Sequence, residues 1–365
     1  MDKRYLIALL GFGMTIASGY CKLPKSLIPT EKEKIAFLNE ADDFIDEIPE
    51  GTQDKQCDAV LHAMRGQTGE LSNIRMSRNS LPELSSAVSR TDLIGDGSAR
   101  GINMRLYSPA GKDATPLPLL IYFHGGGWTF GSINSCARFC DSLAASGKVI
   151  VLAVDYSLAP EKAYPSGLLD CISAIEYAFS HASEWGVDPA MISLGGDSAG
   201  GNLALASALY LQESPLSSGA IKSLVLFYPV LKAYADGSRS WKGYSRGYGL
   251  DSRLMEAFNE AYLSTPPTGT VVSPATTGAS DKENPLISPA HANDSQLKNL
   301  PPILLINGER DILCDQGKIF TERLEKIGHD TERIEFPGSV HLFITVDGQP
   351  SAFSKAVALT EAFLH

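Results

Sequence analysis

The sequence predicts an α/β fold in which a mostly parallel sheet is wrapped by helices. Strand-like apolar runs follow one another after residue 100, and helical stretches alternate with most of them. This alternation is typical of parallel sheets with helical connections. Working residues in such sheets gather at the carboxyl ends of the strands, so catalytic residues are expected there. The strand-like runs lie at 102–109, 116–123, 148–156, 191–196, 223–230, 302–308 and 331–337.

Length, composition and charge limit the possible function classes. A chain of 365 residues with 44% hydrophobic residues is long enough for one large α/β domain with additions. The formal net charge of -11, with no Lys/Arg-rich run, argues against a nucleic-acid partner. The sequence has no apolar run of about 18 residues or more, so no segment is expected to span a membrane by itself.

The first 19 residues resemble a secretion signal. A charged start at 2–4 is followed by a short apolar run at 5–16 and by small residues at 17–19. We therefore expect cleavage near Gly19 and export to the periplasm or the medium. A buried helix and an uncleaved anchor are alternatives, and so is a lipid-attached Cys21, although the bulky residue before this cysteine fits a lipidation signal poorly.

A leader at 20–90 precedes the predicted sheet. It is polar and helical to about residue 65, with apolar residues at helical spacing over 32–48, and then becomes Ser/Arg-rich and poorly patterned. Because the leader is too short for a separate catalytic domain, we expect it to lie over the main body at 91–365.

An insertion at about 231–285 interrupts the alternation of strands and helices. Its Pro/Thr/Ser/Gly-rich tract at 266–281 is expected to form a mobile loop. The aromatic residues of the insertion either line a substrate pocket or pack a small subdomain, and the sequence leaves both possibilities open. These residues are Tyr234, Trp241, Tyr244, Tyr248 and Tyr262.

The six cysteines show no metal-ligand spacing. Cys21 and Cys57 are the one candidate disulfide, because an exported protein can oxidise its thiols. The other four lie in predicted core elements and are expected to be buried small apolar residues. They are Cys136, Cys140, Cys171 and Cys314.

The segment 191–211 predicts a strand, a sharp turn and a helix, with Ser198 at the turn. Gly196 and Gly200 flank the serine as G-x-S-x-G, and a bend this tight needs neighbours without a Cβ. The amide of Ala199 then begins a helix, where unpaired donors favour an anion. A phosphate-binding turn is the alternative, but the sequence has neither G-K-S/T nor G-x-G-x-x-G at this place.

Three glycines follow His124 at the end of another predicted strand. Consecutive glycines let main-chain N–H groups turn toward one point. The amides of Gly126 and Gly127, together with that of Ala199, could bind the oxyanion of a tetrahedral acyl intermediate. A flexible glycine turn without a catalytic role is the alternative.

His341 is the expected general base, because it follows the last predicted strand at the sheet edge that carries Ser198. His329 precedes that strand and lies at the wrong edge. His124 lies at the correct edge, but its place before the glycines favours a structural hydrogen bond. The remaining histidines lie in the leader, in a connection, at the exit of the insertion and at the terminus: His62, His181, His291 and His365.

Asp311 is the expected partner of the imidazole, because it leaves the end of the strand that precedes His341 in sequence. Glu309 and Asp315 are close competitors, and Asp315 is expected to be the N-cap of the following helix. Asp155 also ends a strand, but it comes before the serine. The remaining order, serine, aspartate and then histidine, is the order that α/β-hydrolases use.

Five motifs together resemble the hormone-sensitive-lipase family of α/β-hydrolase esterases. The resemblance covers roughly residues 100–345, and the motifs follow one another in the family's order. They are HGGGW from His124, DYSLAPE at 155–161, GDSAGG at 196–201, GERDIL at 308–313 and PGSVHLF around His341.

The resemblance implies an α/β-hydrolase fold with a cap formed by N-terminal helices and the insertion. It also implies a serine carboxylester hydrolase for small esters with short or medium acyl chains, and the motifs imply no metal or organic cofactor. The positions that match the family's nucleophile, base and acid are Ser198, His341 and Asp311, and those that match its oxyanion hole are Gly126, Gly127 and Ala199.

The sequence departs from the family pattern at Ile312, Cys314 and Ser157, where Pro, Arg and Arg are common. These changes affect loop packing and specificity more than the chemistry. Two other functions remain open. One is deacetylation of a carbohydrate or another natural acetyl ester by the same residues, and the other is small-molecule binding on a hydrolase scaffold that has lost its activity.

Overall fold

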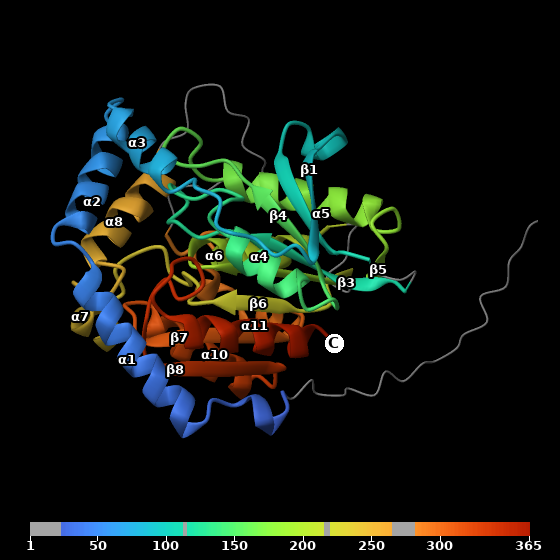
Figure 1. The fold of residues 1–365 in the computed structure, drawn as a ribbon. Coiled ribbons are helices and arrows are strands. Elements are labelled where there is room, and N and C mark those ends of the chain that lie inside the picture. Colours follow the sequence, from blue (N-terminus) through green and yellow to red (C-terminus); the bar gives the residue numbers. More distant parts are fainter. Residues whose placement is uncertain (1–22, 112–114, 215–219, 265–281) are drawn as a thin grey trace, which may run out of the picture.

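The computed structural model describes residues 23–111, 115–214, 220–264 and 282–365. Within these ranges it has an eight-stranded sheet in the order β1-β2-β4-β3-β5-β6-β7-β8 (Figure 1). Neighbouring strands from β4 to β8 in this order run parallel, whereas β2 is antiparallel to both β1 and β4. The strands are β1 (Val88–Ile94), β2 (Asn103–Pro109), β3 (Leu117–Phe123), β4 (Ile150–Asp155), β5 (Val187–Asp197), β6 (Leu224–Phe227), β7 (Ile303–Arg310) and β8 (Thr331–Val340).

Helices connect most strands and cover both faces of the sheet (Figure 1), as the alternation in the sequence predicted. The leader contributes α1 (Glu31–Glu47), α2 (Thr52–Ala63) and α3 (Gly69–Ser77). The insertion contributes α7 (Arg239–Gly243) and α8 (Ser252–Tyr262). The other helices are α4 (Ala137–Ala144), α5 (Ser166–His181), α6 (Ala199–Leu211), α9 (Asp294–Lys298), α10 (Cys314–Lys326) and α11 (Pro350–Leu364).

Both faces of the sheet are buried, which is why its central strands are apolar throughout. Along β3, Leu119, Ile121 and Phe123 belong to one hydrophobic cluster, and Leu120 and Tyr122 belong to the other. This alternation follows from the two-residue period of a strand.

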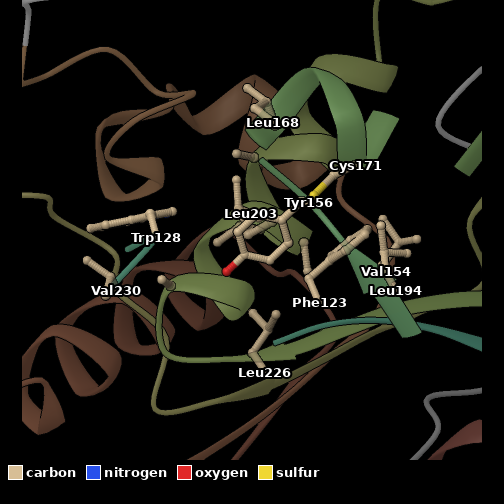
Figure 2. Close-up of a cluster of buried hydrophobic side chains, with 14 of the residues drawn as sticks. Phe123, Trp128, Val154, Tyr156, Leu168, Cys171, Leu194, Leu203, Leu226 and Val230 are labelled. Atoms are coloured by element: carbon tan, nitrogen blue, oxygen red, sulfur yellow. The ribbon is translucent and has the colours of Figure 1, made fainter. Parts of the chain in front are cut away.

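Figure 2 shows part of the first cluster, where helices α5 and α6 cover the sheet. Leu168 and Cys171 of α5 and Leu203 of α6 lie around Tyr156, close to Phe123. The strand that ends at Phe123 and the helix that follows Ser198 are therefore held in one packed core.

All seven predicted strands are present, as β2 to β8, and the structure adds β1. Strand β1 begins at Val88, inside the segment that the sequence assigned to the leader. It is an edge strand whose side chains are mostly exposed, so it carries little hydrophobic signal. Its Arg90 is paired with Asp141 next to the sheet.

Helix α1 packs on the last strand of the sheet. The ring of Phe37 is fully buried and lies 4.9 Å from that of Phe336 on β8, measured between centroids. Around this contact Lys355 pairs with Glu33 at 2.7 Å, and the amide of Ser351 donates to Glu40 at 2.9 Å.

Helix α2 lies along α8 of the insertion (Figure 1). Arg253 on α8 pairs with Asp54 and Asp58 on α2 at 3.1 and 3.0 Å. The thiol of Cys57 lies in the same contact and donates to the carbonyl oxygen of Arg253 at 3.7 Å. Helix α2 of the leader and α8 of the insertion are thus packed together.

Several expectations concern residues that lie outside the described ranges: the signal at 1–19, the tract at 266–281 and Cys21. Cys57 has a free, buried thiol, and its pairing with Cys21 stays a prediction. No helix in the described part of the chain has the length and apolar character that crossing a bilayer requires. The burial predicted for the other cysteines is confirmed for Cys136, Cys140, Cys171 and Cys314.

We predict that Phe37→Ala lowers the free energy of unfolding by about 3–5 kcal/mol, because it empties a fully buried aromatic site. Chemical denaturation measures this loss. Ile35→Ala on the same helix is the control, since the Ile35 side chain is 61% exposed and its removal should change stability by about 0.5 kcal/mol or less. Equal effects of the two substitutions would show that α1 does not rest on β8.

Candidate active site

Ser198 occupies a strained turn between β5 and α6. Its backbone has a φ of 55° and a ψ of -117°, which a non-glycine residue rarely adopts. The two arms of the turn pass close to β3: a Cβ on Gly200 would lie 1.9 Å from the carbonyl oxygen of Phe123, and one on Gly196 would lie 2.5 Å from the same atom. Only glycine fits these two positions, as the sequence predicted. The amide of Ser198 donates to the carbonyl of Phe227 at 2.9 Å and fixes the turn to β6.

His341 directly follows β8, and Asp311 directly follows β7. His341 Nε2 lies 3.1 Å from Ser198 Oγ, and His341 Nδ1 lies 2.6 Å from Asp311 Oδ2. A carboxylate only accepts, so Nδ1 donates to Asp311 and leaves Nε2 to accept from the serine hydroxyl. Ser198 is 4% exposed, and His341 and Asp311 are each 1% exposed.

The loops that carry the imidazole and its carboxylate are themselves held. The other oxygen of Asp311 accepts from the amide of Leu313 at 2.8 Å. The ring of Tyr228 lies 4.3 Å from the His341 ring, and its hydroxyl accepts from the amide of Ile344. The orientation of His341 is thus fixed by its position at the end of β8, by the hydrogen bond to Asp311 and by the Tyr228 ring.

The glycine loop after β3 is held by Asp197, the residue before Ser198. The Asp197 carboxylate accepts from the Gly125 amide at 3.0 Å and from the Tyr122 hydroxyl at 2.9 Å. Burial raises the pKa of Asp197 to about 6, although both hydrogen bonds favour the charged form. No role was predicted for Asp197, and its position in GDSAGG was the signal that could have indicated one.

The next two glycines leave their amides unpaired. The φ angles of Gly126 and Gly127 are 115° and 60°. A Cβ on Gly127 would lie 2.1 Å from the Phe258 ring, so the insertion packs directly on this loop. None of the described residues accepts a hydrogen bond from the amides of Gly126, Gly127 or Ala199. These donors remain available for a bound oxygen.

The other histidines do not reach Ser198. His329 lies at the opposite edge of the sheet, between the Thr331 hydroxyl at 2.6 Å and the carbonyl of Leu300 at 3.0 Å. His124 is fully buried, and its Nδ1 donates to the carbonyl of Gly125 at 2.8 Å, which is the structural hydrogen bond that the sequence predicted. Burial lowers the pKa of His124.

The competing carboxylates hold loops rather than the imidazole. Glu309 accepts from the amide of Gly338 at 2.7 Å. The predicted N-cap role of Asp315 is wrong, because α10 begins at Cys314 with Leu313 as its N-cap and Asp315 lies inside the helix. The Asp315 carboxylate instead accepts from the amide of Ser240 at 2.9 Å.

The aromatic residues of the insertion mainly pack. The Tyr262 ring stacks on Trp128 at a centroid distance of 4.2 Å, and Trp241 is buried in the same hydrophobic cluster. Tyr244 and Tyr248 contact each other, while Tyr244 lines a separate cavity beside Glu309. Of the two possibilities that the sequence left open, packing describes Tyr262 and Trp241.

A cavity of about 410 Å³ opens beside the glycine loop. Gly125 and Gly126 line it, and so do Asp197 and Leu342, which are the sequence neighbours of Ser198 and His341. This volume is within the range of small-molecule sites. No group of three or more His, Cys, Asp or Glu side chains in the described ranges could hold a metal ion.

Comparisons with known proteins agree with this architecture. A family model described as alpha/beta hydrolase fold matches residues 120–345. An arylesterase from Saccharolobus solfataricus is 34% identical over 72% of this chain and 78% of its own length. An acetyl esterase from Salmonella schwarzengrund is 28% identical over 67% of this chain and 69% of its own.

Solved esterase structures have the same fold. A fungal esterase from Rhizomucor miehei superposes with a TM-score of 0.69 and 27% identity, over 90% of this chain and 95% of its own. A hyperthermophilic esterase from the archaeon Pyrobaculum calidifontis gives a TM-score of 0.68 and 28% identity, over 83% and 95%. Because the family model covers more than half of the chain, this protein belongs to the α/β-hydrolase family of carboxylesterases that its motifs resembled.

Proposed function

We propose that this protein hydrolyses esters with short- to medium-chain acyl groups through Ser198, His341 and Asp311. The observation that carries the proposal is the continuous hydrogen-bonded row from Asp311 through His341 to Ser198, at 2.6 and 3.1 Å. A serine in hydrogen-bond contact with an imidazole that a carboxylate orients is the arrangement required for nucleophilic acyl transfer.

In the first half of the reaction, Ser198 Oγ attacks the ester carbonyl carbon while His341 Nε2 takes the hydroxyl proton. Asp311 stabilises the imidazolium that forms. The amides of Gly126, Gly127 and Ala199 donate to the oxyanion, where they supply stabilisation that the ground state lacks. The C–O bond to the alcohol then breaks, His341 returns the proton to the leaving oxygen, and the acyl group stays on Ser198.

In the second half, a water molecule gives a proton to His341 and attacks the acyl carbon. The tetrahedral intermediate collapses with release of the carboxylic acid, and Ser198 Oγ recovers its proton from the imidazolium. Each half uses the same base and the same amides, so a single site performs both.

Carboxylic ester hydrolysis, the general activity, follows from the family to which the chain belongs and from its similarity to the esterases of Saccharolobus and Salmonella. The preference for short or medium acyl chains is supported by the cavity of about 410 Å³ beside Gly126, which suits a small substrate.

The relative named acetyl esterase favours a second candidate, hydrolysis of a natural acetyl ester such as an acetylated carbohydrate. Parallel assays of acetylated glycans and of aryl esters from acetyl upward separate the two. A specific enzyme would prefer the glycan, and a general esterase would follow acyl-chain length.

Export is part of the proposal, supported by the charged, apolar and small-residue segments at 2–4, 5–16 and 17–19. We expect the exported protein to begin near Tyr20. N-terminal sequencing of protein from the medium or the periplasm measures this, and protein found only in cells with Met1 retained would contradict it.

We predict that Ser198→Ala lowers kcat for p-nitrophenyl butyrate by several orders of magnitude, because it removes the attacking oxygen. Diisopropyl fluorophosphate should label the parent protein and not this variant, as seen by intact mass. Ser295→Ala, on exposed α9, is the control and should be labelled normally. Turnover or labelling that survives in Ser198→Ala would remove Ser198 from its proposed role and would favour another nucleophile.

We predict that Asp311→Asn lowers kcat about 10³- to 10⁴-fold, because an amide can donate to Nδ1 and so favours the wrong imidazole tautomer. Asp315→Asn is the matched control, since an amide oxygen can still accept from the Ser240 amide. Steady-state kinetics on one ester compare the two variants. A small loss in Asp311→Asn, or a comparable loss in Asp315→Asn, would argue against this acid.

A further inference from the structure

An arginine in the cavity beside the glycine loop has no acidic partner among the residues that the structure describes. Arg78 lines the cavity of about 410 Å³ together with Gly126, whose amide is proposed to bind the oxyanion. It also lines a second cavity of about 330 Å³, and Leu342 belongs to both. Arg78 therefore lies where the two cavities meet, beside the space that a substrate at Gly126 would occupy.

The backbone around Arg78 is fixed on both sides. One turn before it on α3, Arg75 donates to the carbonyl oxygen of Thr129 at 2.8 Å and pairs with Glu161. One residue after it, the Asn79 side chain accepts from the Ser132 hydroxyl at 2.6 Å. These contacts attach the segment to the chain that follows the glycine loop, so Arg78 is held at a set position.

The Arg78 side chain rests on an aromatic ring rather than on a carboxylate. Its guanidinium carbon lies 5.1 Å from the centroid of the Phe130 ring, and it forms no ion pair with any described residue. Arg138, which lines the same cavity, is paired with Asp347 at 3.1 Å. The Arg78 side chain is exposed to solvent, and it lines the cavity.

The electrostatics agree with this geometry. Although the Arg78 side chain is open to solvent, the protein atoms around it partly desolvate the guanidinium and lower the pKa of Arg78. No carboxylate among the described residues raises this pKa, although Asp347 and Glu47 line the same cavities. An arginine in these surroundings keeps its charge at neutral pH. A chain of net charge -11 repels anions overall, and Arg78 supplies a positive charge that can attract one locally.

We propose that Arg78 binds a carboxylate at the far end of the substrate, so that the enzyme prefers esters that carry one negative charge remote from the scissile bond. This inference rests on the proposed function and adds a substrate class to it. A carboxylate matches the planar guanidinium in two parallel hydrogen bonds. A doubly charged phosphate suits the cavity less well, because Asp197 and Asp347 also line it.

The test compares charged and neutral esters of matched length. One pair carries the charge on the acyl side, p-nitrophenyl hemiglutarate against p-nitrophenyl pentanoate. The other carries it on the alcohol side, 4-acetoxybenzoate against its methyl ester. For each pair we divide kcat/KM for the charged ester by kcat/KM for the neutral ester. We predict that Arg78→Met lowers this ratio about 10- to 100-fold in one of the two pairs, because a charge-assisted hydrogen-bonded contact is lost.

Two further variants make the result specific. Arg78→Lys keeps the positive charge but lacks the planar pair of guanidinium donors, so its ratio should lie between those of the parent protein and Arg78→Met. Arg65→Met removes an equal charge from an exposed position near the end of α2, outside the cavity, and should leave both ratios unchanged. Ratios that Arg78→Met leaves unaltered in both pairs, or that Arg65→Met lowers equally, would overturn the proposal.

A binding measurement separates this inference from the proposed catalysis. Calorimetric titration of Ser198→Ala protein with monomethyl glutarate should give a Kd that weakens at least about tenfold when Arg78→Met is added. If no ester is hydrolysed but this difference persists, the proposed function fails and the carboxylate site stands. If esters are hydrolysed and neither the ratios nor the Kd depend on Arg78, the carboxylate site fails alone.

Discussion

The close approach of two backbones at Ser198 is the constraint on which the rest of the site depends. The turn from β5 to α6 presses against the end of β3, so that Gly200 leaves no room for a side chain beside the carbonyl groups of Phe123 and His124. The same contact therefore positions the serine and the beginning of the glycine loop. Asp197 adds a hydrogen bond from this turn to the Gly125 amide. Nucleophile and amide donors are thus parts of one rigid unit rather than two loops that meet by chance.

The positions of the main polar residues could be predicted because each ends a strand of a parallel sheet. Ser198, Asp311 and His341 follow β5, β7 and β8, and parallel strands bring their carboxyl ends to one edge. The same rule separated His341 from His329, which precedes β8. The interior was equally predictable, since strands that are buried on both faces read as unbroken apolar runs. A strand-like run in this sequence was therefore a dependable sign of its place in the sheet.

The parts that could not be predicted are held by contacts between distant polar residues. Strand β1 and helix α3 are amphipathic only weakly, and their places depend on pairs such as Arg90 with Asp141 and Arg75 with Glu161. A short-range sequence pattern does not predict which distant residue a polar side chain will contact. The N-cap of α10 was misplaced for a related reason, because Asp315 accepts a hydrogen bond from the insertion rather than from its own helix. Asp197 was overlooked because its carboxylate acts through hydrogen bonds to Tyr122 and Gly125, which lie far away in the sequence.

The packing of α1 on β8 has a consequence for how the chain reaches its native state. Phe37 lies near the beginning of the sequence and its partner Phe336 near the end, and Glu33 likewise pairs with Lys355. When a chain emerges from a ribosome or a translocation pore, Phe336 and Lys355 appear long after Phe37 and Glu33. The apolar side of α1 must therefore stay uncovered until β8 and α11 have also been released. The N-terminal helices thus reach their final packing only after the last strand of the sheet has been synthesised.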